Sequence, residues 1–364
     1  PTVERADLLG AITRLYSDCY CVCGTHGKTT VSSMLTQIMI QCGKDPSTVI
    51  GGELPLIRSH GRVGETQNMV CEACEFKDHF LKLDPDIAII LNVDADHLEY
   101  FKNIENIIKS FNRFAKMANK AVIYNGDDAN TLKAIADVGG KDMITFGLDK
   151  SNDFYAENVE MVNAFAHFDA YKKGEKIGSV KLKVPGKHNV TNALAALAAA
   201  DYCGIPFDKA IASLEQFGGA CRRFEILAKL NGITFADDYA HHPTELRVTL
   251  EAAMQMRYRK VWAVFQPFTY SRTKKLMDDF AEVLKIPDEC VMTEIMGSRE
   301  VNTEGVYTSQ LAAKIPGSVW FNTFDEVADY VLAHAQSGDL VITLGCGDIY
   351  KAAKLMIKRL ENEK

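Results

Sequence analysis

Residues 24–30 carry the residue types that hold a nucleotide triphosphate: Gly-Thr-His-Gly-Lys-Thr-Thr, between a short apolar run and a helix-period pattern. Glycines let backbone N–H groups turn toward an anion, Lys28 adds a positive charge, and the hydroxyl of Thr29 can bind Mg²⁺. Val22 stands where the general phosphate-binding loop has its first glycine, so this is a shortened variant. The alternative is an ordinary glycine turn before a helix. The predicted nucleotide contacts are Gly24, Thr25, His26, Gly27, Lys28, Thr29 and Thr30.

Acidic and imidazole side chains follow two further predicted strands, residues 69–73 and 87–93. Glu72 lies at the end of the first strand, and His97 comes just after the second. The ends of parallel strands open onto one crevice, where oxygen and nitrogen ligands can hold Mg²⁺ against phosphates. We therefore predict a magnesium site at Thr29, Glu72 and His97. The alternative makes Glu72 a solvated loop acid and His97 a helix cap.

Two asparagines mark a possible adenine site. Asn189 and Asn192 are three residues apart at the start of an alanine-rich helical pattern, so they lie on one helix face. Side-chain amides both donate and accept, as an adenine edge requires. Helix N-capping by Asn189 is the alternative, and it is compatible with the first interpretation.

Charged residues gather again in the second half of the chain. Arg222 and Arg223 suit phosphate oxygens, and Asp238 can accept hydrogen bonds from ribose hydroxyls. His241 follows a predicted strand end, which is a common active-site position, whereas helix-start polarity explains His242 equally well. Arg272, after another strand end, is a candidate carboxylate clamp.

The elements that must position these residues form two α/β patterns. Strands and helices alternate up to residue 124, which predicts a parallel sheet with helices on both faces. Residues 154–184 alternate polar and apolar side chains and predict an antiparallel flap, followed by a helix over 190–202. A second pattern of Rossmann type begins after Phe217, with a hairpin about Asn231-Gly232. Helices are predicted over 104–117 in the first pattern and 274–284 in the second, and strands over 261–265 and 340–344. We therefore predict a central phosphate-loop domain over residues 1–217 and a Rossmann-like domain over 218–364.

Composition narrows the class of partner. The chain has 364 residues, 47% hydrophobic content and a net charge of −7, which argues against nucleic-acid binding. No apolar stretch has membrane-spanning length, so we expect no membrane partner. Ten cysteines in a chain of this length do not form a disulfide scaffold, so we expect the reducing cytoplasm as the compartment. Cys19, Cys21 and Cys23 alternate and should fill a core face. Because the chain begins at Pro1 and enters the phosphate loop at once, we expect a missing preceding domain.

As a set, these motifs resemble the Mur ligases, and the resemblance covers nearly the whole chain. It rests on GTHGKTT at 24–30, EACE at 72–75, NVDADH at 92–97, GKHNVTNALAA at 186–196, RRFE at 222–225, DDYAHHPTE at 237–245, QPFTYSRT at 266–273 and LGCGDIY at 344–350. The family has a domain for the UDP-sugar, a central ATP domain and a C-terminal domain for the amino acid. This chain resembles the second and third domains only.

The resemblance implies an ATP-dependent amide ligase of peptidoglycan precursor synthesis, acting through an acyl phosphate. Its substrates would be UDP-N-acetylmuramate and L-alanine, with ATP and Mg²⁺. It also implies that Lys28 contacts the β- and γ-phosphates, Arg223 contacts phosphates, and His241 and Arg272 position the alanine or the lactyl carboxylate. Phe268 departs from the family, which usually has a histidine there.

Two rival functions stay open on sequence grounds, and a third is excluded. The nearest is a ligase that recycles a murein tripeptide. A non-catalytic nucleotide-binding module is another. A GTPase-like switch lacks its guanine-reading signature, because Asn119-Lys120 is followed by Ala121-Val122. The oligomeric state is not predicted.

Overall fold

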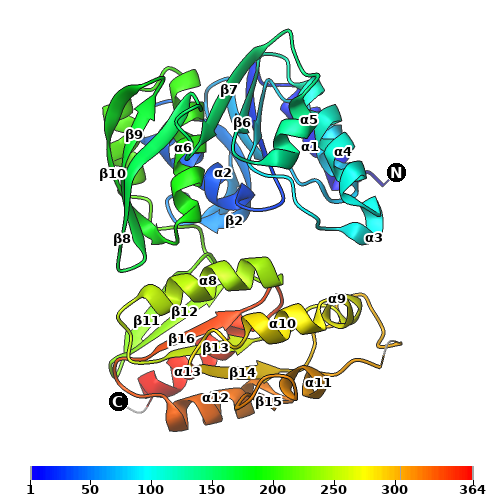
Figure 1. Ribbon diagram of the computed structural model, residues 1–364, viewed down its shortest axis with the longest axis vertical. Helices are drawn as coiled ribbons and strands as arrows, with labels where there is room; N and C mark the ends of the chain where they lie inside the picture. Colours follow the sequence, from blue (N-terminus) through cyan, green and yellow to red (C-terminus); the bar gives the residue numbers. More distant parts are fainter. Residues whose placement is uncertain (1, 304, 363–364) are drawn as a thin grey trace. The chain divides into compact units, whose positions relative to one another are not determined.

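The computed structural model describes residues 2–303 and 305–362. The chain divides into two compact units, Pro1–Cys221 and Arg222–Lys364, each of which has its own sheet and hydrophobic core (Figure 1). We call them the first and the second unit. The predicted division after residue 217 lies four residues before this point.

A mostly parallel sheet forms the centre of the first unit. Among the described residues it has ten strands in the order β10-β9-β8-β7-β6-β5-β1-β4-β2-β3. The pairs β2–β3, β8–β9 and β9–β10 are antiparallel, and the last two form the predicted flap. The strands are β1 (Asp18–Cys23), β2 (Ser47–Leu54), β3 (Ser59–Arg62), β4 (Asn68–Glu72), β5 (Ile87–Ile90), β6 (Ala121–Asn125), β7 (Asp142–Gly147), β8 (Phe154–Val162), β9 (Phe165–Lys172) and β10 (Glu175–Pro185).

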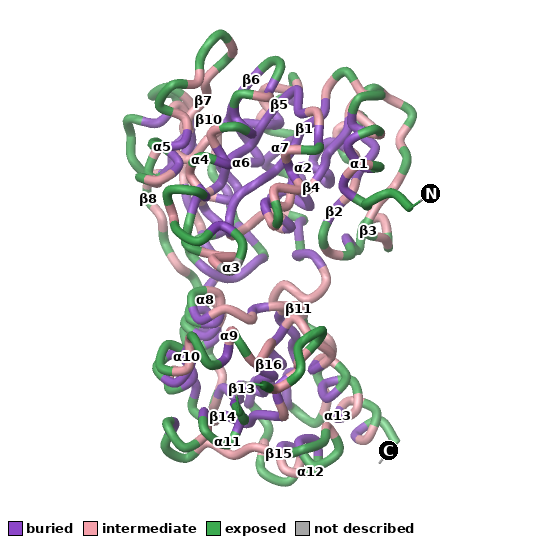
Figure 2. The backbone as a smooth tube through the Cα atoms, turned by 90° about the vertical axis from the view of Figure 1, so that its right-hand side faces the viewer, coloured by how far each residue is buried: buried purple, intermediate pink, exposed green. Residues whose placement is uncertain are grey.

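Helices bury both faces of this sheet. Alternate strand residues point to opposite faces and contribute to two separate core clusters. One cluster joins Tyr20 and Val22 to α2 (Lys28–Gln41), α6 (His188–Tyr202) and α7 (Phe207–Leu214). The other joins the fully buried Cys19, Cys21 and Cys23 to α1 (Arg5–Thr13), α4 (Ile104–Met117) and the 3₁₀ helix η1 (Phe76–Lys82). The cysteines therefore fill a core face, as predicted. Figure 2 shows the buried backbone concentrated in β1, β5, α2 and α6. Two short helices, α3 (Leu98–Phe101) and α5 (Ala129–Ile135), complete the unit.

The second unit is a smaller α/β layer structure. Its sheet has the order β11-β12-β16-β13-β14-β15 among the described residues, and β11–β12 is its antiparallel pair. This pair is the predicted hairpin: Asn231 and Gly232 have φ of 50° and 79°, the left-handed values of a tight turn. The strands are β11 (Glu225–Leu230), β12 (Ile233–Asp238), β13 (Val261–Phe265), β14 (Glu289–Thr293), β15 (Val319–Phe321) and β16 (Leu340–Leu344); the helices are α8 (Pro243–Gln255), α9 (Tyr270–Lys275), α10 (Met277–Val283), α11 (Thr308–Ala312), α12 (Phe324–His334) and α13 (Tyr350–Asn362).

The predicted fold class is confirmed, with two local corrections. β5 ends at Ile90, before the predicted end at Val93: the N–H of Leu91 still donates to Cys23 at the end of β1, and the carbonyl of Asn92 already accepts from Thr25 in the loop beyond it. The helix predicted over 274–284 is two helices, α9 and α10, which meet at Leu276 with φ −110° and ψ 21°. In the described ranges, no helix is both long enough and apolar enough to cross a membrane.

Candidate functional site

The phosphate loop lies between β1 and α2, as predicted. Gly27 caps α2 with φ of 86°, a left-handed value that favours glycine. A Cβ at this position would come within 3.0 Å of Asn192 Oδ1 on α6, so the loop and α6 touch directly. The first N–H groups of α2 have no partner inside the helix, and they supply the partial positive charge that attracts anions.

Asn92, the second residue after β5, fixes the conformation of this loop. Its Oδ1 accepts from the N–H of His26 at 2.8 Å, and its Nδ2 donates to the carbonyl of the same residue at 3.1 Å. The carbonyl of Asn92 accepts from the N–H of Thr25 at 3.1 Å. Since the amides of Thr25 and His26 are engaged in this way, the start of α2 is the part of the loop that faces an incoming phosphate with its N–H groups.

Lys28 forms a buried ion pair with Glu75. The Lys28 Nζ lies 3.0 Å from Glu75 Oε1 and also donates to the carbonyls of Gly24 and Thr25. Burial acts to lower the pKa of Lys28, but the charge and hydrogen bond of Glu75, together with Cys74 and Glu72, raise the pKa overall. The ammonium therefore stays protonated throughout the physiological range.

Glu72 and Thr29 lie against two consecutive glycines of β2, Glu72 against Gly51 and Thr29 against Gly52. Glu72 Oε2 accepts from the N–H of Gly51 at 2.8 Å, and a Cβ on Gly51 would come closer than 3.0 Å to that carboxylate. A Cβ on Gly52 would come closer than 3.0 Å to Thr29 Cγ2. The sequence reasoning missed this double glycine, although glycines inside a strand often mark such close approaches.

His97 lies beside the loop that follows β4. It occupies the N-cap position of α3 without a side-chain capping bond, and its ring centroid is 4.8 Å from that of Phe76. Its Nε2 is 3.8 Å from Asp96 Oδ2. The described residues contain no group of three His, Cys, Asp or Glu side chains arranged for a metal. The Thr29 hydroxyl and the Glu72 carboxylate still fit Mg²⁺, because this ion commonly takes one or two carboxylates and completes its shell with phosphates and water.

Asn189 and Asn192 lie together in the first turn of α6, and both are buried. Asn192 Nδ2 donates to Asn189 Oδ1 at 2.8 Å, and Asn189 Nδ2 donates to the carbonyl of Pro185. Lys187, rather than Asn189, is the N-cap residue, so the capping alternative is wrong. The contact between Asn192 and Gly27 brings this pair to the edge of the phosphate loop.

In the second unit, Arg222 and Arg223 are adjacent in the sequence but make different polar contacts. Arg222 holds the ends of β12 and β16 together, because its Nε donates to Asp237 Oδ2 at 2.8 Å and its guanidinium donates to the carbonyls of Gly345 and Gly347. Both guanidinium groups lie over the ring of Tyr239, that of Arg222 at 5.0 Å and that of Arg223 at 5.3 Å from its centroid. Asp238 is buried and accepts from the N–H groups of Phe224 and Ala240.

His241 follows β12 and Arg272 follows β13, the two strands that flank β16 in the sheet of the second unit. His241 Nδ1 lies 3.1 Å from the carbonyl of Tyr239 and 3.3 Å from Glu245 Oε2, and its ring faces Phe268 at 6.5 Å. Arg272 Nη1 is buried and makes no hydrogen bond within the part of the chain that the structure describes. His242 accepts from the N–H of Thr244 as the cap of α8, which matches its alternative interpretation.

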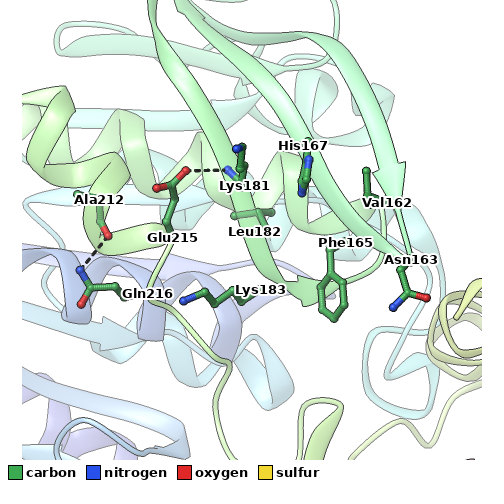
Figure 3. A pocket seen from close by; sticks show the side chains of 10 residues that line it. All are labelled: Val162, Asn163, Phe165, His167, Lys181, Leu182, Lys183, Ala212, Glu215 and Gln216. Atoms are coloured by element: carbon green, nitrogen blue, oxygen red, sulfur yellow. Dashed lines mark hydrogen bonds between the residues drawn. The ribbon is translucent and has the colours of Figure 1, made fainter. Parts of the chain in front are cut away.

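A separate cavity of about 690 Å³ lies between the flap and α7 (Figure 3). The side chains that line it are Val162, Asn163, Phe165, His167, Lys181, Leu182, Lys183, Ala212, Glu215 and Gln216. None of the predicted site residues is among them.

Comparison with known proteins identifies the class. Residues 22–200 match the Mur ligase middle domain, and residues 222–347 match the Mur ligase glutamate ligase domain. A UDP-N-acetylmuramate–L-alanine ligase of Caldanaerobacter subterraneus is 41% identical over 371 aligned residues, which cover 100% of this chain and 80% of the relative. The chain belongs to the Mur ligase family, and the prediction of a ligase of peptidoglycan precursor synthesis is confirmed.

Solved structures agree with this assignment. A UDP-N-acetylmuramate–alanine ligase of Thermotoga maritima is 26% identical with a TM-score of 0.83, over 98% of this chain and 78% of that one. A murein peptide ligase of Psychrobacter arcticus is 25% identical with a TM-score of 0.74, over 99% of this chain and 81% of that one. The family is ATP-dependent, which accounts for the phosphate loop.

Proposed function

We propose that this chain joins L-alanine to the lactyl carboxylate of UDP-N-acetylmuramate, with ATP as the energy source and Mg²⁺ as the metal ion. The observation that carries the proposal is the loop between β1 and α2, where Lys28 and the start of α2 lie next to the buried asparagine pair of α6. The similarity to relatives named for this reaction supports the same substrates. Both nucleotide substrates are intracellular metabolites, so we propose the cytoplasm as the compartment.

The residues have separate roles in the proposed reaction. Lys28 and the start of α2 bind the β- and γ-phosphates, and Asn189 and Asn192 contact the adenine. Thr29, Glu72 and His97 hold Mg²⁺, which neutralises charge on the transferring phosphoryl group. Arg223 contacts phosphate, and Asp238 contacts the ribose.

The chemistry runs in two steps. The lactyl carboxylate first attacks the γ-phosphorus of ATP, giving an acyl phosphate and ADP. The neutral amine of L-alanine then attacks the acyl carbon, and phosphate leaves. His241 and Arg272 position the alanine or the lactyl carboxylate; the buried, unbonded Arg272 Nη1 supports a carboxylate ligand at this place.

Phosphate release from ATP tests the proposal. In a protein that also carries the UDP-sugar domain of the family, release should require both UDP-N-acetylmuramate and L-alanine. Lys28→Ala should abolish it, because the substitution removes the ammonium that contacts the phosphates and leaves the buried Glu75 carboxylate without its counter-charge. The exposed Lys150→Ala is the matched control and should leave turnover unchanged. A Lys28→Ala variant that keeps its turnover would contradict the site.

A tripeptide ligase is the second candidate, and the similarity to the murein peptide ligase favours it. Comparing turnover with L-alanine and with a murein tripeptide distinguishes the two. We expect L-alanine to be the better substrate, and faster turnover with the tripeptide would reverse the assignment.

A further inference from the structure

All three ammonium protons of Lys28 have acceptors within the protein. The Lys28 Nζ donates to the carbonyls of Gly24 and Thr25 and to Glu75 Oε1, and Glu75 Oε2 is 2.9 Å away. An ammonium has three donor protons. Lys28 can therefore contact a phosphate oxygen only by exchanging one of these partners.

Glu75 is the partner that stays. Its side chain is 3% exposed and that of Lys28 is 14% exposed, so separating them would leave a carboxylate buried without a counter-charge. The two carbonyls are neutral, and releasing one of them costs less. A phosphate that reaches Lys28 therefore displaces a loop carbonyl and meets an ammonium that is still paired with a carboxylate.

This arrangement changes the charge that a nucleotide encounters. The charge of Glu75 cancels that of Lys28, and the carboxylate of Glu72, held at Gly51, adds a further negative charge nearby. The partial charge at the start of α2 is the attraction that remains, and it is worth less than a full positive charge. A bare triphosphate is thus poorly matched to the loop, whereas a triphosphate that brings a divalent cation is well matched.

We propose that Glu75 is a positioning residue that makes this site accept ATP as its magnesium complex and disfavour metal-free ATP. Glu75 is not a metal ligand here: it holds the Lys28 ammonium at the loop and cancels its charge. The inference rests on the proposed function, because it concerns the form of ATP that the same site binds.

Calorimetric titration of the 364-residue chain with ATP, once with EDTA and once with excess MgCl₂, tests this role. In EDTA, Glu75→Gln should bind ATP at least about tenfold more tightly than the unchanged protein, which corresponds to ~1.4 kcal/mol. In MgCl₂ the same substitution should increase the affinity less, so the ratio of the affinity in MgCl₂ to that in EDTA should fall. Glu75→Asp keeps the negative charge and should keep the ratio of the affinity in MgCl₂ to that in EDTA. Glu65→Gln removes an exposed carboxylate of the same unit and should also leave this ratio unchanged.

Other variants separate this role from those of its neighbours. Glu72→Gln should weaken binding in MgCl₂, because it removes a proposed metal ligand, whereas Glu75→Gln should not. Thermal unfolding checks that each variant is folded. A folded Glu75→Gln variant whose affinity in EDTA is unchanged or weaker overturns the inference and leaves the proposed function intact.

The unchanged protein provides a second measurement that needs no substitution. Its affinity for ATP in EDTA should be at least about tenfold below that in MgCl₂. Equal affinities would overturn the role of Glu75, and no ATP binding under either condition would overturn the proposed function as well.

Discussion

Arg223 and Asp238 are charged neighbours in the second unit, and their interaction is measurable. Burial raises the pKa of Asp238 to about 6, and the charge of Arg223 and the N–H groups of Ala240 and Phe224 act to lower it. The native state therefore keeps a proton that the unfolded chain releases between the ordinary aspartate pKa and about pH 6. The raised pKa of Asp238 therefore stabilises the folded state at low pH, and this stabilisation is lost as the pH rises from the ordinary aspartate pKa through about 6.

We expect Arg223→Gln to raise the pKa of Asp238 above its value in the unchanged protein, because a stabilising positive charge is removed. Carboxyl carbon chemical shifts, followed by NMR from pH 3 to pH 8, measure the midpoint. Arg247→Gln is the control, since Arg247 is an exposed residue of α8 paired with Glu251. An Asp238 midpoint near 4 in the unchanged protein, or no shift in Arg223→Gln, would refute this electrostatic account.

The residue types at 24–30 predicted a phosphate loop, but the ion-pair and hydrogen-bond partners of the site residues depend on the tertiary fold. The pairing of Lys28 with Glu75 joins residues that are 47 positions apart, and no local pattern indicates which acid reaches the ammonium. Asn92 carried a weak signal, since it is a polar residue just after a buried strand. The buried hydrogen bonds of Asp238 could not be predicted, because they come from two separate backbone segments.

At the scale of elements, β2 forms one wall of the proposed metal site. Its N–H at Gly51 orients the Glu72 carboxylate, and Gly52 leaves room for Thr29. Both glycines are needed for the approach of their neighbours. The strand thus contributes to the site without supplying a predicted ligand.

Gly51→Ala should displace the Glu72 carboxylate and weaken Mg²⁺-supported ATP binding by about tenfold or more, the scale of lost supporting contacts at metal sites. Titrating the protein and a fixed ATP concentration with MgCl₂ measures the effect directly. Gly139→Ala is the matched control, because an added Cβ there meets nothing within 4 Å. Identical magnesium dependence in both variants would show that β2 does not position Glu72.

Strongly periodic or wholly apolar elements were predicted best. The helix over 104–117 and the strands over 261–265 and 340–344 match α4, β13 and β16, since amphipathic spacing or continuous apolar runs defined them. The β2–β3 hairpin was missed because glycines and polar residues interrupt its pattern. The break between α9 and α10 was missed because an apolar residue, Leu276, lies at the junction.

At the scale of the whole molecule, two units with separate cores each gather polar residues at strand ends. The sequence predicted this division because the strand–helix pattern starts again after the flap and the alanine-rich helix. It also predicted an anion site in a chain with net charge −7. An anion site is compatible with a negative net charge, because a few nearby groups, rather than the total charge, determine the affinity of a buried phosphate site.

A crystal structure with a non-hydrolysable ATP analogue and Mg²⁺ tests the central claim most directly. We predict that the triphosphate lies at the start of α2 against Lys28, and that one metal ion lies among the Thr29 hydroxyl, Glu72 and His97. A nucleotide bound elsewhere, or a metal ion with neither Glu72 nor His97 in its shell, would contradict the account.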